Sequence, residues 1–188
     1  MRTLIARVFD YSLDGRACDA EGTKFFQFCR DLPDDPAQTV ATSEFFAGAD
    51  LQIMGRVHYQ DMAGYFPDAV DDPFADLLNA ARKVVFSRTL TSADWANTTI
   101  ASGDLAEEVD KLRRGGDGYI CVGGGISFWQ SLARLDLIDE YHVTVVPYLA
   151  ADEGIRLFDD IGESRPLDLA SSTVFDNGTV DLQYRRHR

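Results

Sequence analysis

Apolar residues fall into short runs that glycine, proline and acidic residues separate. The run at 139–149 alternates apolar and polar positions before it becomes fully apolar, which is typical of a central strand. Near the end of the chain, two alternating segments flank Asn177-Gly178, a pair that predicts a tight antiparallel hairpin. Four shorter apolar runs also predict strands: 3–9, 51–55, 83–87 and 118–122.

Helical spacing alternates with these strands. Residues 104–114 give the clearest amphipathic helix, with Asp104 placed to cap its first turn. The acidic and proline residues of 33–36 predict a break in the chain, after which Ser43 is expected to cap a new helix. The other predicted helices cover 23–31, 56–62, 74–81 and 126–135.

The order of these elements predicts the fold class. Alternating strands and helices followed by a hairpin indicate an α/β protein with a mixed, mostly parallel central sheet and helices on both faces. The chain has 188 residues and shows no internal repeat, so we predict one domain over residues 1–188.

Composition narrows the possible partners. The formal net charge of −13 disfavours binding to nucleic acid or to anionic membranes. No apolar run approaches the roughly 20 residues of a membrane span, and Asp10 and Asp14 come too early for a signal peptide. We therefore expect a cytoplasmic protein. Cys18, Cys29 and Cys121 form an odd set without metal-ligand spacing, which indicates reduced thiols and no bound metal.

Three predicted strands end in turns that suit an anionic ligand. These turns are Met54-Gly55-Arg56, Phe86-Ser87-Arg88 and Val122-Gly123-Gly124-Gly125. Each offers backbone N–H groups, a hydroxyl or a guanidinium where a strand gives way to a loop or helix. The triple glycine alone fits a ligand site and a plain tight turn equally well, because Phe128 stands where a dinucleotide fingerprint has its third glycine.

The order of several motifs carries a family resemblance. The segment VGGGISFWQSL, preceded by MGRVHY and KVVFSRTL and followed by DEYHVTVVPYL, resembles the dihydrofolate reductase superfamily. Ser12-Leu13-Asp14-Gly15-Arg16 is similar to the branch that contains the C-terminal reductase domain of bifunctional riboflavin-biosynthesis enzymes. The resemblance spans nearly the whole chain and implies the three-layer dihydrofolate reductase-like fold.

The resemblance also implies a cofactor, NADPH. By analogy with the family, the Gly123–Gly124 peptide bond would be cis and would lie beside the nicotinamide and pyrophosphate. Ser87 and Arg88 would receive the adenosine 2′-phosphate. The full set of implied cofactor residues is Gly55, Arg56, Val57, Ser87, Arg88, Val122, Gly123, Gly124, Gly125, Ile126 and Phe128.

The substrate side is less defined. Thr144 resembles the family threonine that supports the substrate, and it fits equally well as a β-branched strand residue. Dihydrofolate reductases manage a proton with a carboxylate on the first helix, where this chain has Thr23 and Lys24. The nearest acids there are Glu21 and Asp31, and this departure disfavours folate reduction.

Asp14 is the alternative acid near the predicted pocket, although an aspartate before glycine is also typical of a plain turn. His58, His142 and His187 are isolated and receive no predicted role.

We therefore predict an NADPH-dependent reductase that transfers a hydride to a small heterocyclic or ribosyl-linked substrate. The riboflavin-pathway compound 5-amino-6-(5-phosphoribosylamino)uracil is one such substrate. Two alternatives remain open, a true dihydrofolate reductase and a non-catalytic nucleotide-binding module. The final hairpin is also a candidate surface for a homodimer.

Overall fold

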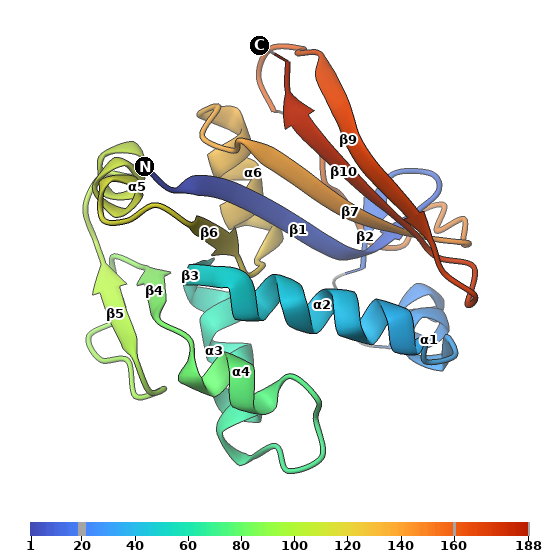
Figure 1. Ribbon diagram of the computed structural model, residues 1–188, viewed down its shortest axis with the longest axis horizontal. Helices are drawn as coiled ribbons and strands as arrows, with labels where there is room; N and C mark the ends of the chain where they lie inside the picture. The colour runs from blue at the N-terminus through green and yellow to red at the C-terminus, as the bar shows by residue number, and fades with distance from the viewer. Residues whose placement is uncertain (19–21, 160, 188) are drawn as a thin grey trace.

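The computed structural model describes residues 1–18, 22–159 and 161–187, and its strands and helices alternate before a final hairpin (Figure 1). The strands are β1 (Thr3–Ser12), β2 (Arg16–Ala17), β3 (Ala49–Gly55), β4 (Lys83–Phe86), β5 (Thr98–Ala101), β6 (Tyr119–Val122), β7 (Glu140–Val146), β8 (Ile155–Arg156), β9 (Leu167–Val174) and β10 (Val180–Arg186). The helices are α1 (Lys24–Asp31), α2 (Pro36–Gly48), α3 (Arg56–Tyr65), the 3₁₀ turn η1 (Phe66–Asp68), α4 (Ala75–Ala80), α5 (Leu105–Arg114) and α6 (Ile126–Arg134).

The main sheet has the strand order β5-β4-β3-β6-β1-β7-β10-β9. Its first six strands are parallel neighbours, while β10 runs antiparallel to β7 and β9 antiparallel to β10. The predicted mixed, mostly parallel sheet with a C-terminal antiparallel hairpin is therefore confirmed.

Helices cover both faces of this sheet because successive strand residues are apolar and point to opposite sides. On β3, Ile53 packs in a cluster that includes Val109 of α5 and Leu132 of α6. The next residue, Met54, packs with Tyr59 of α3 on the other face. Helix α2 also packs on that second face, where its Phe45 contacts Ile5 of β1 and Cys121 of β6, and it runs below β1 in Figure 1. The three layers of the predicted fold are thus present.

Helix α2 corrects one sequence prediction. The helix expected to begin at Ser43 instead begins at Pro36, and Asp35 caps it by accepting hydrogen bonds from the backbone N–H groups of Ala37 and Gln38. Proline suits the first helical position because it needs no N–H partner there. Ser43 lies inside the helix, so the residues interpreted as a break are its start signal.

Other boundaries follow the predictions closely. The helices predicted at 23–31 and 104–114 are α1 and α5, and Asp104 caps α5 as expected. The Asn177-Gly178 turn joins β9 to β10, with Gly178 at a φ of 85°. The short strands β2, β5 and β8 escaped prediction. Strand β9 lies at the edge of the sheet, so its outer side could pair with a second copy of the chain. The homodimer through this hairpin stays a prediction. In the described chain, no helix combines the length and apolar character that crossing a membrane requires.

Candidate active site

The three strand ends predicted to form one groove lie next to one another. Strands β4, β3 and β6 are adjacent and parallel, with Gly55 opposite Phe86 and Ile53 opposite Val122. The turns that follow these strands therefore leave the same edge of the sheet. The predicted convergence of the three turns is confirmed. It depends on the order of the strands in the sheet, which the sequence alone does not give.

Two helices at this edge begin with free backbone N–H groups. Helix α3 starts after Gly55 and α6 after Gly125, and neither has a side-chain cap. The other helices of eight or more residues in the described chain are capped, by Thr23 on α1, Asp35 on α2 and Asp104 on α5. Uncapped N–H groups at a helix N-terminus attract anions. The arrangement suits an anionic group at the ends of β3 and β6.

The glycine turn between β6 and α6 has a conformation that side chains resist. Gly124 has a φ of 136° and Gly125 a φ of 87°. A Cβ atom on Gly124 would also lie 2.6 Å from Cε1 of His58. The predicted cis peptide bond is not found, because no described peptide bond is cis. Glycine is required here by positive φ and by the His58 ring.

The apolar members of the predicted cofactor set differ in burial. Phe128 is buried and approaches Gly55 so closely that a Cβ there would lie 3.0 Å from Cβ of Phe128. Val122 is also buried, and Ile126 packs against the same core. Val57 is exposed. These contacts give Phe128, Val122 and Ile126 a packing role that sets the spacing between α6 and β3.

The predicted phosphate contacts lie at the surface of the same edge. Arg56 and Arg88 are exposed, and Nη1 of Arg56 donates to Oε1 of Gln60 at 2.7 Å. Oγ of Ser87 accepts hydrogen bonds from the backbone N–H groups of Thr89 (3.2 Å) and Leu90 (2.9 Å). Ser87 therefore shapes the turn that presents Arg88.

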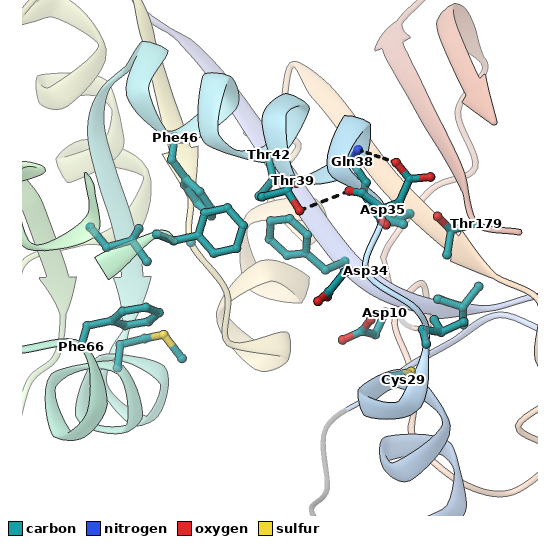
Figure 2. Close-up of a pocket in the computed structure, with 18 of the residues that line it drawn as sticks. Asp10, Cys29, Asp34, Asp35, Gln38, Thr39, Thr42, Phe46, Phe66 and Thr179 are labelled. Carbon is teal, nitrogen blue, oxygen red and sulfur yellow. Dashed lines mark hydrogen bonds between the residues drawn. The ribbon is translucent and has the colours of Figure 1, made fainter. Parts of the chain in front are cut away.

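A cavity of about 400 Å³ opens beside Gly123 (Figure 2). Its volume falls in the range of small-molecule sites. Helices α1, α2 and α3 and strands β1, β3 and β7 all contribute to its walls. Aromatic side chains form one group of lining residues: Phe9, Phe46, Phe66, Phe74 and Trp95. Polar side chains form another: Asp10, Asp34, Asp35, Gln38, Thr39, Thr42, Gln52, His58, Thr144 and Thr179.

Asp10 is one of three acids that line the cavity. Its carboxylate faces the cavity beneath the start of α2, near Cys29 and Asp34 (Figure 2). Desolvation by the surrounding protein raises its pKa, and a hydrogen bond with the thiol of Cys29 only partly opposes this. A raised pKa keeps a carboxyl group closer to the protonated form that can donate a proton.

Asp14, the predicted catalytic acid, lies outside the lining of this cavity. Its carboxylate accepts hydrogen bonds from Oγ of Ser12 (2.7 Å) and from the backbone N–H groups of Ala150 (2.9 Å) and Ala151 (2.8 Å). Led by the Ser12 bond, these contacts lower its pKa to about 2. The geometry favours a structural role for Asp14, which ties the turn after β1 to the loop after β7.

Thr144 lines the cavity. Its hydroxyl donates to Oδ1 of Asp181, whose Oδ2 pairs with Nη2 of Arg7 at 3.0 Å. All three residues are buried, and Nη2 of Arg7 also reaches Thr42 at 3.5 Å. This network fixes the direction of the Thr144 hydroxyl at the cavity floor.

The sequence interpretation missed two residues of the site. His58 lines the cavity, and burial lowers its pKa although a backbone hydrogen bond with Gly123 opposes the shift. Its position three residues after Gly55 was the only local signal. The predicted first strand ends at residue 9, but β1 continues past Asp10 to Ser12. Thr23 caps α1, Asp31 ends it and neither lines the cavity, while Glu21 is outside the described residues.

The part of the chain that the structure describes holds no group of three or more His, Cys, Asp or Glu side chains suited to a metal ion.

Comparison with known proteins places this geometry in a family. The Bacillus subtilis (strain 168) protein YyaP, whose function is uncharacterised, is 29% identical over 148 residues, which cover 76% of this chain and 77% of YyaP. A Shewanella sp. PV-4 protein with a provisional riboflavin-biosynthesis name superposes with a TM-score of 0.76 at 24% identity, over 99% of both chains. Dihydrofolate reductase from Enterococcus faecalis, solved with NADP(H), gives a TM-score of 0.64 at 15% identity, over 99% of this chain and 97% of its own. The family model of the RibD C-terminal domain matches residues 3–180, and the chain belongs to that family.

Proposed function

We propose that this protein is an NADPH-dependent reductase of the RibD C-terminal domain family. One observation carries the proposal. Two uncapped helix N-termini and a glycine turn of positive φ converge at one sheet edge, directly beside an aromatic cavity with acidic groups. Such an edge suits the pyrophosphate of a dinucleotide, and the cavity suits the ring of a reducible substrate.

The charges at the edge support a phosphorylated cofactor. The chain carries a net charge of −13, yet Arg56 and Arg88 directly follow β3 and the Ser87 turn. Ser87 and Arg88 would hold the 2′-phosphate, while Gly123, Gly124 and the start of α6 would hold the pyrophosphate. Bound there, NADPH would supply the hydride, and the protein would supply orientation and exclusion of water.

Reduction of a C=N or C=O group also needs a proton. We assign its donation to Asp10, because this carboxyl group faces the cavity and has a raised pKa. Asp14 is a poor donor because its low pKa keeps it ionised. Thr144, held by Asp181, would orient the substrate from the cavity floor.

The experiment is a comparison of NADPH and NADH binding by isothermal titration calorimetry. We expect the wild-type protein to bind NADPH at least 10-fold more tightly than NADH. Arg88→Ala should weaken NADPH binding by about 10- to 100-fold, the range of a lost charge-assisted hydrogen bond, and leave NADH unchanged.

Arg30→Ala is the matched control, since Arg30 is also exposed but lies on α1. If Arg88→Ala leaves NADPH affinity unchanged while NADH still binds poorly, the 2′-phosphate assignment is wrong. If neither cofactor binds, the proposed function itself is refuted.

A further inference from the structure

The cavity wall combines negative charge with a lack of basic groups. Among the described residues that line it there is no lysine and no arginine, whereas Asp10, Asp34 and Asp35 all contribute carboxyl groups. Figure 2 shows these three acids near the start of α2. A phosphate group entering this space would meet like charge with no guanidinium or ammonium to offset it.

Helix α2, which begins at these acids, offers a phosphate no replacement for those basic groups. Asp35 caps α2 and accepts hydrogen bonds from the N–H groups of Ala37 (2.8 Å) and Gln38 (3.1 Å). Its second oxygen accepts from the N–H group of Asp176 at 2.7 Å. Burial acts to raise the pKa of Asp35, but these backbone bonds outweigh it and lower the pKa. The helix N-terminus is therefore already occupied by an internal anion, unlike those of α3 and α6.

The hydroxyl groups of the wall mostly present acceptors. Thr39, Thr144 and Thr179 each donate their single hydroxyl hydrogen to a protein oxygen, which leaves oxygen lone pairs for a ligand. Together with the carboxylate of Asp34, these groups favour a ligand rich in N–H donors. Gln52 adds a complementary donor, because its Nε2 atom is buried and has no hydrogen-bond partner in the described structure. A buried, unsatisfied amide in a cavity wall indicates a missing acceptor.

The remaining wall is aromatic. Trp95 and Phe66 stack at an interplanar angle of 6°, and Phe46 packs edge-on against Phe74. Flat aromatic surfaces favour a planar ring between or beside them.

We propose that the cavity selects a planar nitrogen heterocycle that bears amino groups and carries no phosphate. This inference rests on the proposed function, since it names the substrate class of the same site. It departs from the phosphoribosyl compound implied by the family resemblance. In this chain, the substrate enters as the free base or the nucleoside, because the acidic wall repels the phosphate ester.

Two matched ligand pairs test the proposal, with the intact chain saturated with NADP⁺ so that no turnover occurs. The first pair is 5-amino-6-(ribosylamino)uracil and its 5′-phosphate, and the second is 2,4-diaminopyrimidine and 2,4-dimethoxypyrimidine. Calorimetry should show the nucleoside binding at least 10-fold more tightly than its phosphate. It should also show the diamino compound binding at least 10-fold more tightly than the dimethoxy compound.

Charge variants identify the origin of the phosphate discrimination. Asp34→Asn should lower the ratio of the phosphate's dissociation constant to the nucleoside's at least 3-fold, as should raising the salt concentration from 50 to 500 mM. Asp110→Asn removes a carboxylate charge from the exposed side of α5, away from the cavity, and should leave that ratio of dissociation constants unchanged.

Equal or tighter binding of the phosphate ester overturns the proposal, and so does a failure of both members of each pair to bind. A titration of NADP⁺ alone distinguishes failure of the proposed function from failure of the proposed substrate class. Without NADP⁺ binding the proposed function fails, whereas NADP⁺ binding with preference for the phosphate ester refutes only the substrate class.

Discussion

Gly124 offers the sharpest test of the glycine turn between β6 and α6. Replacing it with alanine adds one methyl group at a residue whose φ is 136°. That methyl carbon would lie 2.6 Å from Cε1 and 2.7 Å from Nε2 of His58. The Gly124→Ala variant therefore has to strain the backbone and also displace the histidine ring.

The two effects have separate magnitudes. An alanine held at positive φ costs about 1–2 kcal/mol. Pushing the His58 ring off its preferred rotamer adds roughly 0.5–1.5 kcal/mol. For a chain of this length each kcal/mol lowers Tm by roughly 2–4 °C, so we expect Tm to fall by about 3–14 °C. If the turn relaxes by moving away from the cofactor edge, NADPH binding should weaken by about 10- to 100-fold.

The assay is thermal unfolding followed by circular dichroism, paired with NADPH titration. Gly123→Ala is the matched control, because its φ is not in the left-handed region and its methyl would find only ordinary contacts, the nearest 3.6 Å from Cε of Met54. The double variant Gly124→Ala/His58→Ala removes the steric contact and keeps the backbone strain. It should therefore recover part of the lost stability.

Two results would refute this reasoning. Equal loss of stability in Gly123→Ala and Gly124→Ala would show that position 124 is not special. Full recovery in the double variant would show that the ring contact, and not positive φ, explains the need for glycine.

The remaining predictions concern buried charges. Asp181→Asn leaves the buried guanidinium of Arg7 without its charged partner and should lower the free energy of unfolding, measured by urea denaturation, by roughly 3–5 kcal/mol. The double variant Arg7→Met/Asp181→Leu removes both charges and should recover most of this loss. A loss below about 1 kcal/mol in Asp181→Asn would contradict a stabilising role for the ion pair. Lys83 is 1% exposed, its Nζ donates to three backbone carbonyls, and desolvation lowers its pKa to about 8. Below pH 8 this lysine is protonated in both the folded and the unfolded protein. Between pH 8 and about pH 10.4, the pKa of lysine in the unfolded chain, only the unfolded protein binds the proton, so the free energy of unfolding rises with pH. Unfolding at pH 7.5 and pH 9.5 should show this rise in wild type relative to Lys83→Met, and equal slopes for the two proteins would contradict the lowered pKa.

Local patterns in the sequence determined much of the fold. The apolar runs ending at Gly55, Phe86 and Val122 were found because each buried strand has its own composition and its own turn residues. The Asn177-Gly178 hairpin and the capped helix α5 were found for the same reason, since turn chemistry and helical spacing act within a few residues. These features also placed the glycine turn and the two arginines at strand ends.

Only the tertiary structure decided which of these ends meet. The strand order brings β4, β3 and β6 together, although β4 and β6 are separated by β5 and α5 along the chain. The same packing turns Asp10 toward the cavity, while the backbone of residues 150 and 151 engages Asp14. It also sets the His58 ring against Gly124. Sequence patterns report what each segment does with its own neighbours along the chain, but a site is formed by residues distant in sequence, and their meeting depends on how the whole sheet and its helices pack.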